Sequence, residues 1–264
     1  MKKQMFRMLC VVLALALLAP NVFAATPAPE VPLADEATVT RVKNEIANGE
    51  ITDMEDVFLV AYQHLGADLE EEGMTAYINE DGTLGFTQIL NTNQTRSGST
   101  EQELAVTSIA LLNADGTRST ITSISDYTSG SLSSISVYAT HTAYLYKKEI
   151  SLGNMYGTTK YCQLNYAITT INYHTSSFVP TKLVHYYEGT QNYSGVDGIS
   201  EVDDDIIDAP GNGSHSFTPG SRSWFQAGSG TTGWIKTTAT INISNTNNTI
   251  ELSVTYSLAD DEFV

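Results

Sequence analysis

Cysteine is nearly absent from this chain, which has two such residues among 264. Cys10 lies in the apolar N-terminal segment, so Cys162 is alone in the remainder and has no intramolecular disulfide partner. A scaffold cross-linked by disulfides is therefore excluded, and the fold must rely on a hydrophobic core, on sheet hydrogen bonds or on a metal ion. Cys162 alternates with apolar residues along its segment, which is typical of a small buried side chain rather than a nucleophile.

Long apolar runs are also missing after the first 24 residues. Residues 9–19 are apolar, but this run is too short to span a bilayer, and it follows three basic residues. A small residue, Ala24, closes the segment, and together these features predict a secretory signal peptide over residues 1–24. No later apolar stretch reaches about 18 residues, so we expect no transmembrane anchor. The sequence thus predicts a secreted, extracellular bacterial protein that begins near Ala25.

Basic residues are scarce, with 13 Lys and Arg against 30 Asp and Glu, a net charge of −17. The expected signal peptide holds three of the basic residues, so the remainder carries 10 − 30 = −20. Such a charge repels phosphate backbones and anionic lipid headgroups, and this excludes nucleic acid as an expected partner. The acidic residues are unevenly placed: residues 25–81 hold 14 of them and two basic residues, whereas residues 82–196 hold six of each.

The familiar short signatures of catalysis and nucleotide binding are absent as well. The sequence contains no GxSxG, HExxH, SxxK, P-loop or GxGxxG pattern, so no local motif assigns a catalytic residue or a cofactor. His141 lies on the apolar side of an alternating segment and is interpreted as structural. His185 and Glu188 have the spacing of metal ligands on a helix, but the local pattern is that of a strand, which sends them to opposite faces.

Two helical patterns lie in the first part of the chain, after the expected signal peptide. Residues 25–34 predict an extended tether, and residues 35–48 predict a helix with a single apolar face. A second helix is expected from an N-cap at Thr52 to Gly66. Residues 35–73 are thus predicted to form an acidic helical hairpin. Its apolar face either packs permanently across a sheet, or belongs to a pro-segment that a protease removes.

From Met74 onward the apolar period changes to two, which predicts strands. Residues 134–146 alternate cleanly, and a break in the alternation at Thr169 and Thr170 indicates a β-bulge. Residues 188–220, rich in Gly, Asn, Asp and Ser, predict a long polar loop. The fold class is therefore mainly β: an antiparallel β-sandwich or open barrel over residues 74–264, preceded by the short N-terminal helical hairpin.

A cluster of six carboxylates lies within residues 197–208. Its members are Asp197, Glu201, Asp203, Asp204, Asp205 and Asp208. Oxygen-rich loops can hold Ca²⁺, which takes six to eight oxygen ligands, so this segment is a candidate for a structural calcium ion. The spacing is not that of an EF-hand, and the alternative interpretation is a solvated acidic loop.

Three tyrosines, Tyr138, Tyr144 and Tyr146, share one face of the alternating segment 134–146. If they are exposed, they form a stacking platform for a sugar or a peptide. If they are buried, they form the second face of a sandwich strand, and the general enrichment of aromatic residues in strands favours this second interpretation.

Three functions remain open. The first is a secreted, non-enzymatic binding or interaction protein for an extracellular or cell-surface ligand, which fits the expected export and the missing motifs. The second is a membrane-active or antibacterial β-protein that inserts residues 119–137, a Ser- and Thr-rich, nearly uncharged segment, as a hairpin. The third is a secreted hydrolase that uses dispersed carboxylates. The first is preferred, because the alternation in residues 119–137 is broken and no carboxylate pair stands in an apolar setting.

Overall fold

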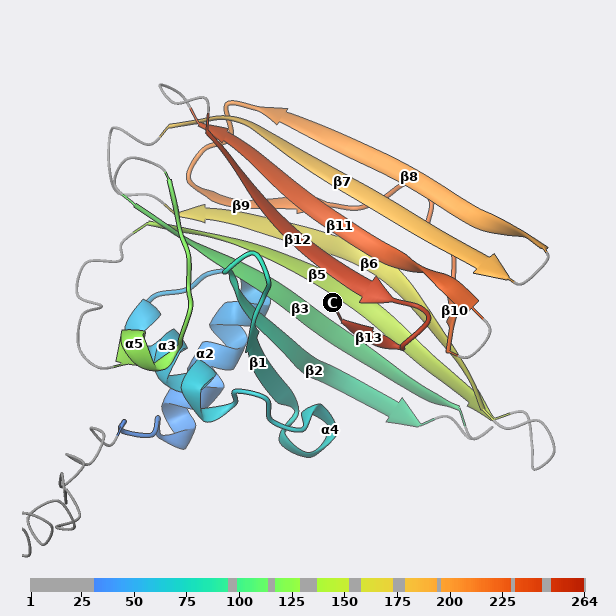
Figure 1. Cartoon of the computed structure of the whole chain (residues 1–264), viewed down its shortest axis with the longest axis horizontal. Coiled ribbons are helices and arrows are strands. Elements are labelled where there is room, and N and C mark those ends of the chain that lie inside the picture. Colours follow the sequence, from blue (N-terminus) through green and yellow to red (C-terminus); the bar gives the residue numbers. More distant parts are fainter. Residues whose placement is uncertain are drawn as a thin grey trace, which may run out of the picture. The chain divides into compact units, whose positions relative to one another are not determined.

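The period-two pattern produces two antiparallel sheets in the computed structural model of the chain. The structure describes residues 31–94, 99–113, 117–128, 137–151, 158–172, 179–193, 196–228, 231–243 and 248–263. From Leu33 onward the chain is one compact unit, and Figure 1 shows its strands and helices.

Sheet A carries the first six strands together with β9 and β10. Its order is β1 (Met74–Ile78), β2 (Leu84–Gln94), β3 (Thr100–Leu112), β5 (Tyr138–Ser151), β6 (Thr158–Asn172) and β10 (Phe225–Ala227), with β4 (Arg118–Ser119) beside β3 and β9 (Gly213–Phe217) beside β6. Sheet B follows the order β13 (Glu262–Phe263), β12 (Thr249–Ser257), β11 (Thr231–Ile243), β7 (Pro180–Tyr193) and β8 (Val196–Asp208). The prediction of a mainly β, antiparallel sandwich with helices before it is confirmed.

The two sheets bury their facing side chains against each other. On β5 the predicted alternation directs Ala139 toward sheet B, where it shares a core with Leu183 of β7 and Ala239 of β11. A second core between the sheets is built around Tyr187, Phe225 and other fully buried side chains. Apolar burial of this extent provides the stabilisation that disulfides would otherwise give.

The other face of sheet A is covered by helices. These are α2 (Glu36–Asn48), α3 (Met54–Gln63), α4 (Leu69–Glu72) and α5 (Ser125–Thr128). Their apolar side chains, including Ile46 and Phe58, form one core with Phe86 of β2 and Tyr138 of β5. The helices thus pack across this face of the sheet and bury their apolar side chains there.

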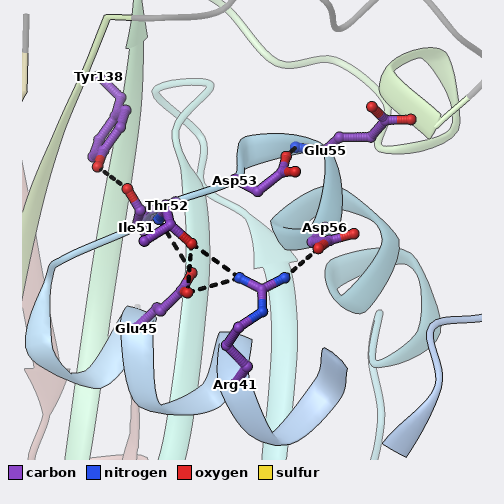
Figure 2. Close-up of polar contacts among 8 residues, drawn as sticks. All are labelled: Arg41, Glu45, Ile51, Thr52, Asp53, Glu55, Asp56 and Tyr138. Carbon is purple, nitrogen blue, oxygen red and sulfur yellow. Dashed lines mark hydrogen bonds and ion pairs between the residues drawn. The ribbon is translucent and has the colours of Figure 1, made fainter. Parts of the chain in front are cut away.

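A polar junction fixes the turn between α2 and α3 (Figure 2). The Arg41 guanidinium donates to Glu45 at 2.7 Å, to the Thr52 hydroxyl at 3.0 Å and to Asp56. Thr52 is therefore not the N-cap: its hydroxyl donates to Glu45 at 2.6 Å, and the side chain of Asp53 caps α3 instead. The prediction at Thr52 was wrong because a contact with the preceding helix competes for that hydroxyl.

Residues 188–220 do not form the predicted loop. They contain the end of β7, all of β8 and all of β9. β8 pairs with β7 from Lys182↔Asp208 onward, and this pairing overrides the weak strand preference of its Gly and Asp residues. β8 ends the order of sheet B, so its outer side chains stay in solvent: Val202 is 60% exposed and Ile206 is 51% exposed.

Among the described residues, no helix is long and apolar enough to cross a membrane. Part of the segment considered for membrane insertion, residues 129–136, lies outside the described ranges. Ile121 and Ile124, from its other part, are 1% and 2% exposed and belong to the core beneath α3. These two side chains therefore serve internal packing rather than a lipid-facing stripe.

Candidate functional site

The helices cover only part of sheet A and leave one end of it open. The covered part ends at Ala105 and Tyr144, which pack with Ala47 of α2. Beyond this level, β2, β3, β5 and β6 continue with polar side chains that are half-buried or exposed. The open end forms a cleft of about 430 Å³, and its lining includes Asn93, Glu101, Gln102 and Lys147 besides the residues described next.

One row of side chains runs across the strands through this cleft. The register pairs Asn91 with Glu103, Glu103 with Tyr146, and Tyr146 with Gln163. Directly paired residues share a face of a sheet, so these four side chains stand side by side. Trp224, the residue before β10, extends the row past β6 and is 40% exposed. The row thus combines two aromatic rings with amides and a carboxylate.

A β-bulge shapes the floor of the cleft. The register between β5 and β6 shifts after Tyr144, which leaves Asn165 as an extra residue in β6. The Asn165 amide donates to the Tyr146 hydroxyl at 3.2 Å, and its side-chain and backbone carbonyl oxygens accept from Arg222 at 3.1 and 3.2 Å. The bulge therefore lies here and not at Thr169, and it brings the Asn165 side chain to the hydroxyl of Tyr146, which lines the cleft.

The segment that carries Trp224 is held from both sides. On the β6 side, the Gln163 amide donates to the backbone carbonyl of Arg222 at 2.6 Å. On the β8 side, Glu201 accepts hydrogen bonds from the Ser221 hydroxyl at 2.8 Å and from the Ser223 backbone at 3.1 Å. These contacts hold the segment from which Trp224 projects, through the Arg222 carbonyl, the Ser221 hydroxyl and the Ser223 amide.

Two of the acidic residues predicted as calcium ligands, Glu201 and Asp203, accept hydrogen bonds from the segment that precedes β10. Partial burial acts to raise the pKa of Glu201, but hydrogen bonds from Ser223 and Ser221 hold it below its usual value. Asp203 accepts from the Gly220 backbone at 2.5 Å. Two of the six carboxylates therefore anchor the segment that carries Trp224.

The other acidic residues do not converge. Asp204, Asp205 and Asp208 are exposed on β8, and alternation along the strand sends successive side chains to opposite faces. The side chain of Asp197 lies outside the described part of the chain. In that part, no group of three or more His, Cys, Asp or Glu side chains is placed to hold a metal ion.

The three tyrosines divide between two environments. Tyr138 and Tyr144 are 5% and 4% exposed, and their hydroxyls donate to backbone carbonyls of Ile51 and Ala47 under the helices. Burial raises the pKa of Tyr138. An exposed platform of all three is therefore ruled out, because the helices cover two of them. Tyr146 alone of the three reaches the cleft.

The histidine and cysteine side chains singled out in the sequence lie in the core. His141 and His185 are fully buried between the sheets and share the Thr169 hydroxyl at 2.9 and 2.8 Å. Glu188 is half-buried on the opposite face of β7, as the strand pattern predicts. Cys162 is fully buried, and burial raises its pKa to about 12. None of these residues lines the cleft.

Trp224, Gln163 and Glu103 did not emerge from the sequence as site residues. The row depends on the register of four strands, and a single sequence does not encode register in any local pattern. The alternating amides Asn91 and Asn93 at the end of β2 were the available signal, since they mark a strand face that stays polar. No protein-family model matches this chain, and no curated protein is similar to it.

Proposed function

We propose that this chain is a secreted, non-enzymatic binding protein, and that the cleft at the open end of sheet A receives its extracellular or cell-surface ligand. The observation that carries the proposal is Trp224, a large aromatic side chain that is 40% exposed, lines the cleft with Tyr146 and projects from a segment held by hydrogen bonds. Rigid aromatic side chains of this kind supply contact area at a low entropic cost.

The polar contacts around Trp224 support binding because the protein's own side chains supply them. The Gln163 amide and the Glu201 carboxylate hold the 220–224 segment through its backbone and serines. A ligand then finds the surface already organised and loses less of its binding energy to ordering.

The placement of reactive groups favours binding over a reaction at a thiol or an imidazole, and of the two carboxylates that line the cleft, Glu101 is held in an ion pair with Lys148. Cys162, His141 and His185 are the usual candidates for nucleophile and base, and all three are fully buried away from the cleft. The burial of Ile121 likewise supports binding over membrane insertion. The extracellular location rests on the signal-peptide pattern of residues 1–24.

Tryptophan fluorescence offers a direct test, since the chain has two tryptophans, Trp224 and Trp234. Trp234 lies on β11 and is 42% exposed, so it matches Trp224 in exposure but is not part of the cleft. The Trp234→Phe variant should show a saturable change in emission with solubilised cell-wall glycans or with cell-surface peptides. Trp224→Ala should abolish retention on whole cells, whereas Trp234→Ala should not. Equal retention of the two alanine variants would refute the proposal.

A further inference from the structure

Building on the proposed function, we infer that the cleft takes an uncharged, hydroxyl-rich chain, that is, a neutral oligosaccharide, and that Glu103 determines this specificity. The inference begins with the kind of surface that the cleft offers. It lies on the face of sheet A, where β2, β3, β5 and β6 pair with one another. Backbone groups in such ladders are already hydrogen-bonded, so a ligand on the face meets side chains only.

This surface disfavours an extended peptide. Peptides that bind sheets usually add as a strand at an exposed edge, where main-chain hydrogen bonds provide the affinity. Along the row, β3, β5 and β6 each have a neighbour on both sides. β1 pairs with β2 only as far as Gln88, so among the described residues an unpaired edge lies beside Asn91, at the end of the row far from Trp224. A ligand seated on Tyr146 and Trp224 is therefore recognised by amide, carboxylate and aromatic side chains.

The side chains of the row match the chemistry of a sugar chain. Asn91 and Gln163 each offer a donor and an acceptor, which a hydroxyl group can meet in either direction. The rings of Tyr146 and Trp224 offer apolar faces for the C–H side of a pyranose ring. Five side chains on successive strands span four interstrand spacings of about 4.8 Å, roughly 19 Å, so the row can contact several linked sugar rings.

The charges of the cleft select against an acidic ligand. Lys148 pairs with Glu101 at 2.9 Å, and Lys147 pairs at 3.0 Å with Asp261, which also pairs with Lys160, so each of the two nearby lysines has a carboxylate partner within the protein. Glu103 is half-buried, and no ion pair to its carboxylate occurs among the described residues. In a chain of net charge −17, a cleft with one uncompensated carboxylate repels anions and accepts hydrogen bonds from neutral hydroxyl groups.

The test uses hexamers of matched length with the full chain carrying Trp234→Phe. The neutral probes are cellohexaose, maltohexaose and N-acetylchitohexaose, the anionic probe is hexagalacturonate, and the peptide probe is (Gly-Ser)₃. We expect at least one neutral probe to bind, by Trp224 fluorescence and calorimetry, and hexagalacturonate to bind at least tenfold more weakly at 0.15 M salt.

Two substitutions assign the specificity. Glu103→Gln should lower the affinity for the best neutral probe about tenfold, because a hydrogen bond to a charged acceptor becomes a weaker one. It should also reduce the difference in affinity between that probe and hexagalacturonate. Asn91→Ala, at the other end of the row, should weaken the same probe about fivefold. Glu149→Gln is the control, since Glu149 is an exposed carboxylate near the end of β5, outside the cleft lining, and its substitution should leave affinity unchanged. Thermal unfolding verifies that each variant is folded.

The outcomes separate this inference from the proposed function. Binding of (Gly-Ser)₃ or hexagalacturonate as strongly as of any neutral probe would overturn the inference and leave the cleft as a binding site. Binding of whole cells through Trp224 without binding of any neutral hexamer would also overturn it. If Glu103→Gln leaves the affinity for the neutral probe unchanged, Glu103 does not determine the specificity. Absence of any response at Trp224 to cells, glycans and peptides would instead refute the proposed function itself.

Discussion

Acidification should destabilise this protein well before its carboxylates titrate, and the cause lies in the core between the sheets. His141 of β5 and His185 of β7 are both fully buried, with ring centroids 6.2 Å apart. The Thr169 hydroxyl lies between them, and Thr237 of β11 contacts the second nitrogen of His141 at 3.2 Å. These neutral partners solvate an uncharged imidazole, but they do not compensate a buried positive charge.

The size of the effect follows from the pKa values of the two histidines. Burial, with a smaller contribution from the neighbouring His185, lowers the pKa of His141 to about 3. Burial lowers the pKa of His185 to about 4, although the charge of Asp205 acts in the opposite direction. An unfolded histidine titrates near about 6.5, so the neutral imidazoles contribute fully above that pH and their contribution is lost as the pH falls toward 4 and below. At pH 5 the loss is about 2 kcal/mol for each residue, about 4 kcal/mol together, which is a large part of a typical folding free energy.

Urea unfolding at pH 7.5, 6 and 5 measures this loss. The wild-type chain should lose about 4 kcal/mol of unfolding free energy between pH 7.5 and 5, and His185→Gln should lose about half as much over the same interval. Substitution of the other member of the pair, His141→Gln, should likewise lose about half as much as the wild-type chain. An unfolding free energy that stays constant from pH 7.5 to 5 would refute the reasoning, as would the full wild-type loss in His185→Gln.

Three further substitutions or deletions test the packing of the helices on sheet A. Gly49 has φ 71°, and a Cβ added there would lie 2.6 Å from the Thr170 hydroxyl, so Gly49→Ala should cost about 1–3 kcal/mol in unfolding free energy. Gly66 has φ 65° and open space around it, so Gly66→Ala should cost less. Equal losses in the two variants would contradict the close approach at Gly49. Tyr138→Phe removes the donor to the Ile51 carbonyl and should cost about 1–3 kcal/mol by thermal or urea unfolding; a loss within error of zero would contradict a stabilising bond. Deletion of residues 25–73 should expose the apolar face of sheet A and cause aggregation by light scattering, whereas a soluble truncation with cooperative unfolding would contradict permanent packing.

The predictions that the structure confirms depend on neighbours in sequence. The alternation along β5 places Ala139 and Tyr138 on opposite faces because a strand has a period of two, whatever pairs with it. The helix predicted over residues 35–48 is α2, and it ends at Gly49, whose left-handed conformation glycine adopts at little cost. The predicted N-cap of α3 was wrong because Thr52 and Asp53 are both good caps, and the choice depends on Glu45 in the preceding helix.

The acidic segment, residues 197–208, shows why the candidate site could not be predicted from the sequence. Its Gly and Asp residues are typical of a loop, but β7 supplies a pairing partner, and the segment becomes the last strand in the order of sheet B. On such a strand, outward carboxylates such as Asp204 are useful without any ion, because charge discourages pairing with a second chain. The inward carboxylates Glu201 and Asp203 then meet the 220–224 segment, which is distant in sequence, and hold it through hydrogen bonds. Glu201 and Asp203, which suggested a metal site in the sequence, therefore hold the segment that carries Trp224. Only the pairing of β8 with β7 brings these carboxylates to that segment.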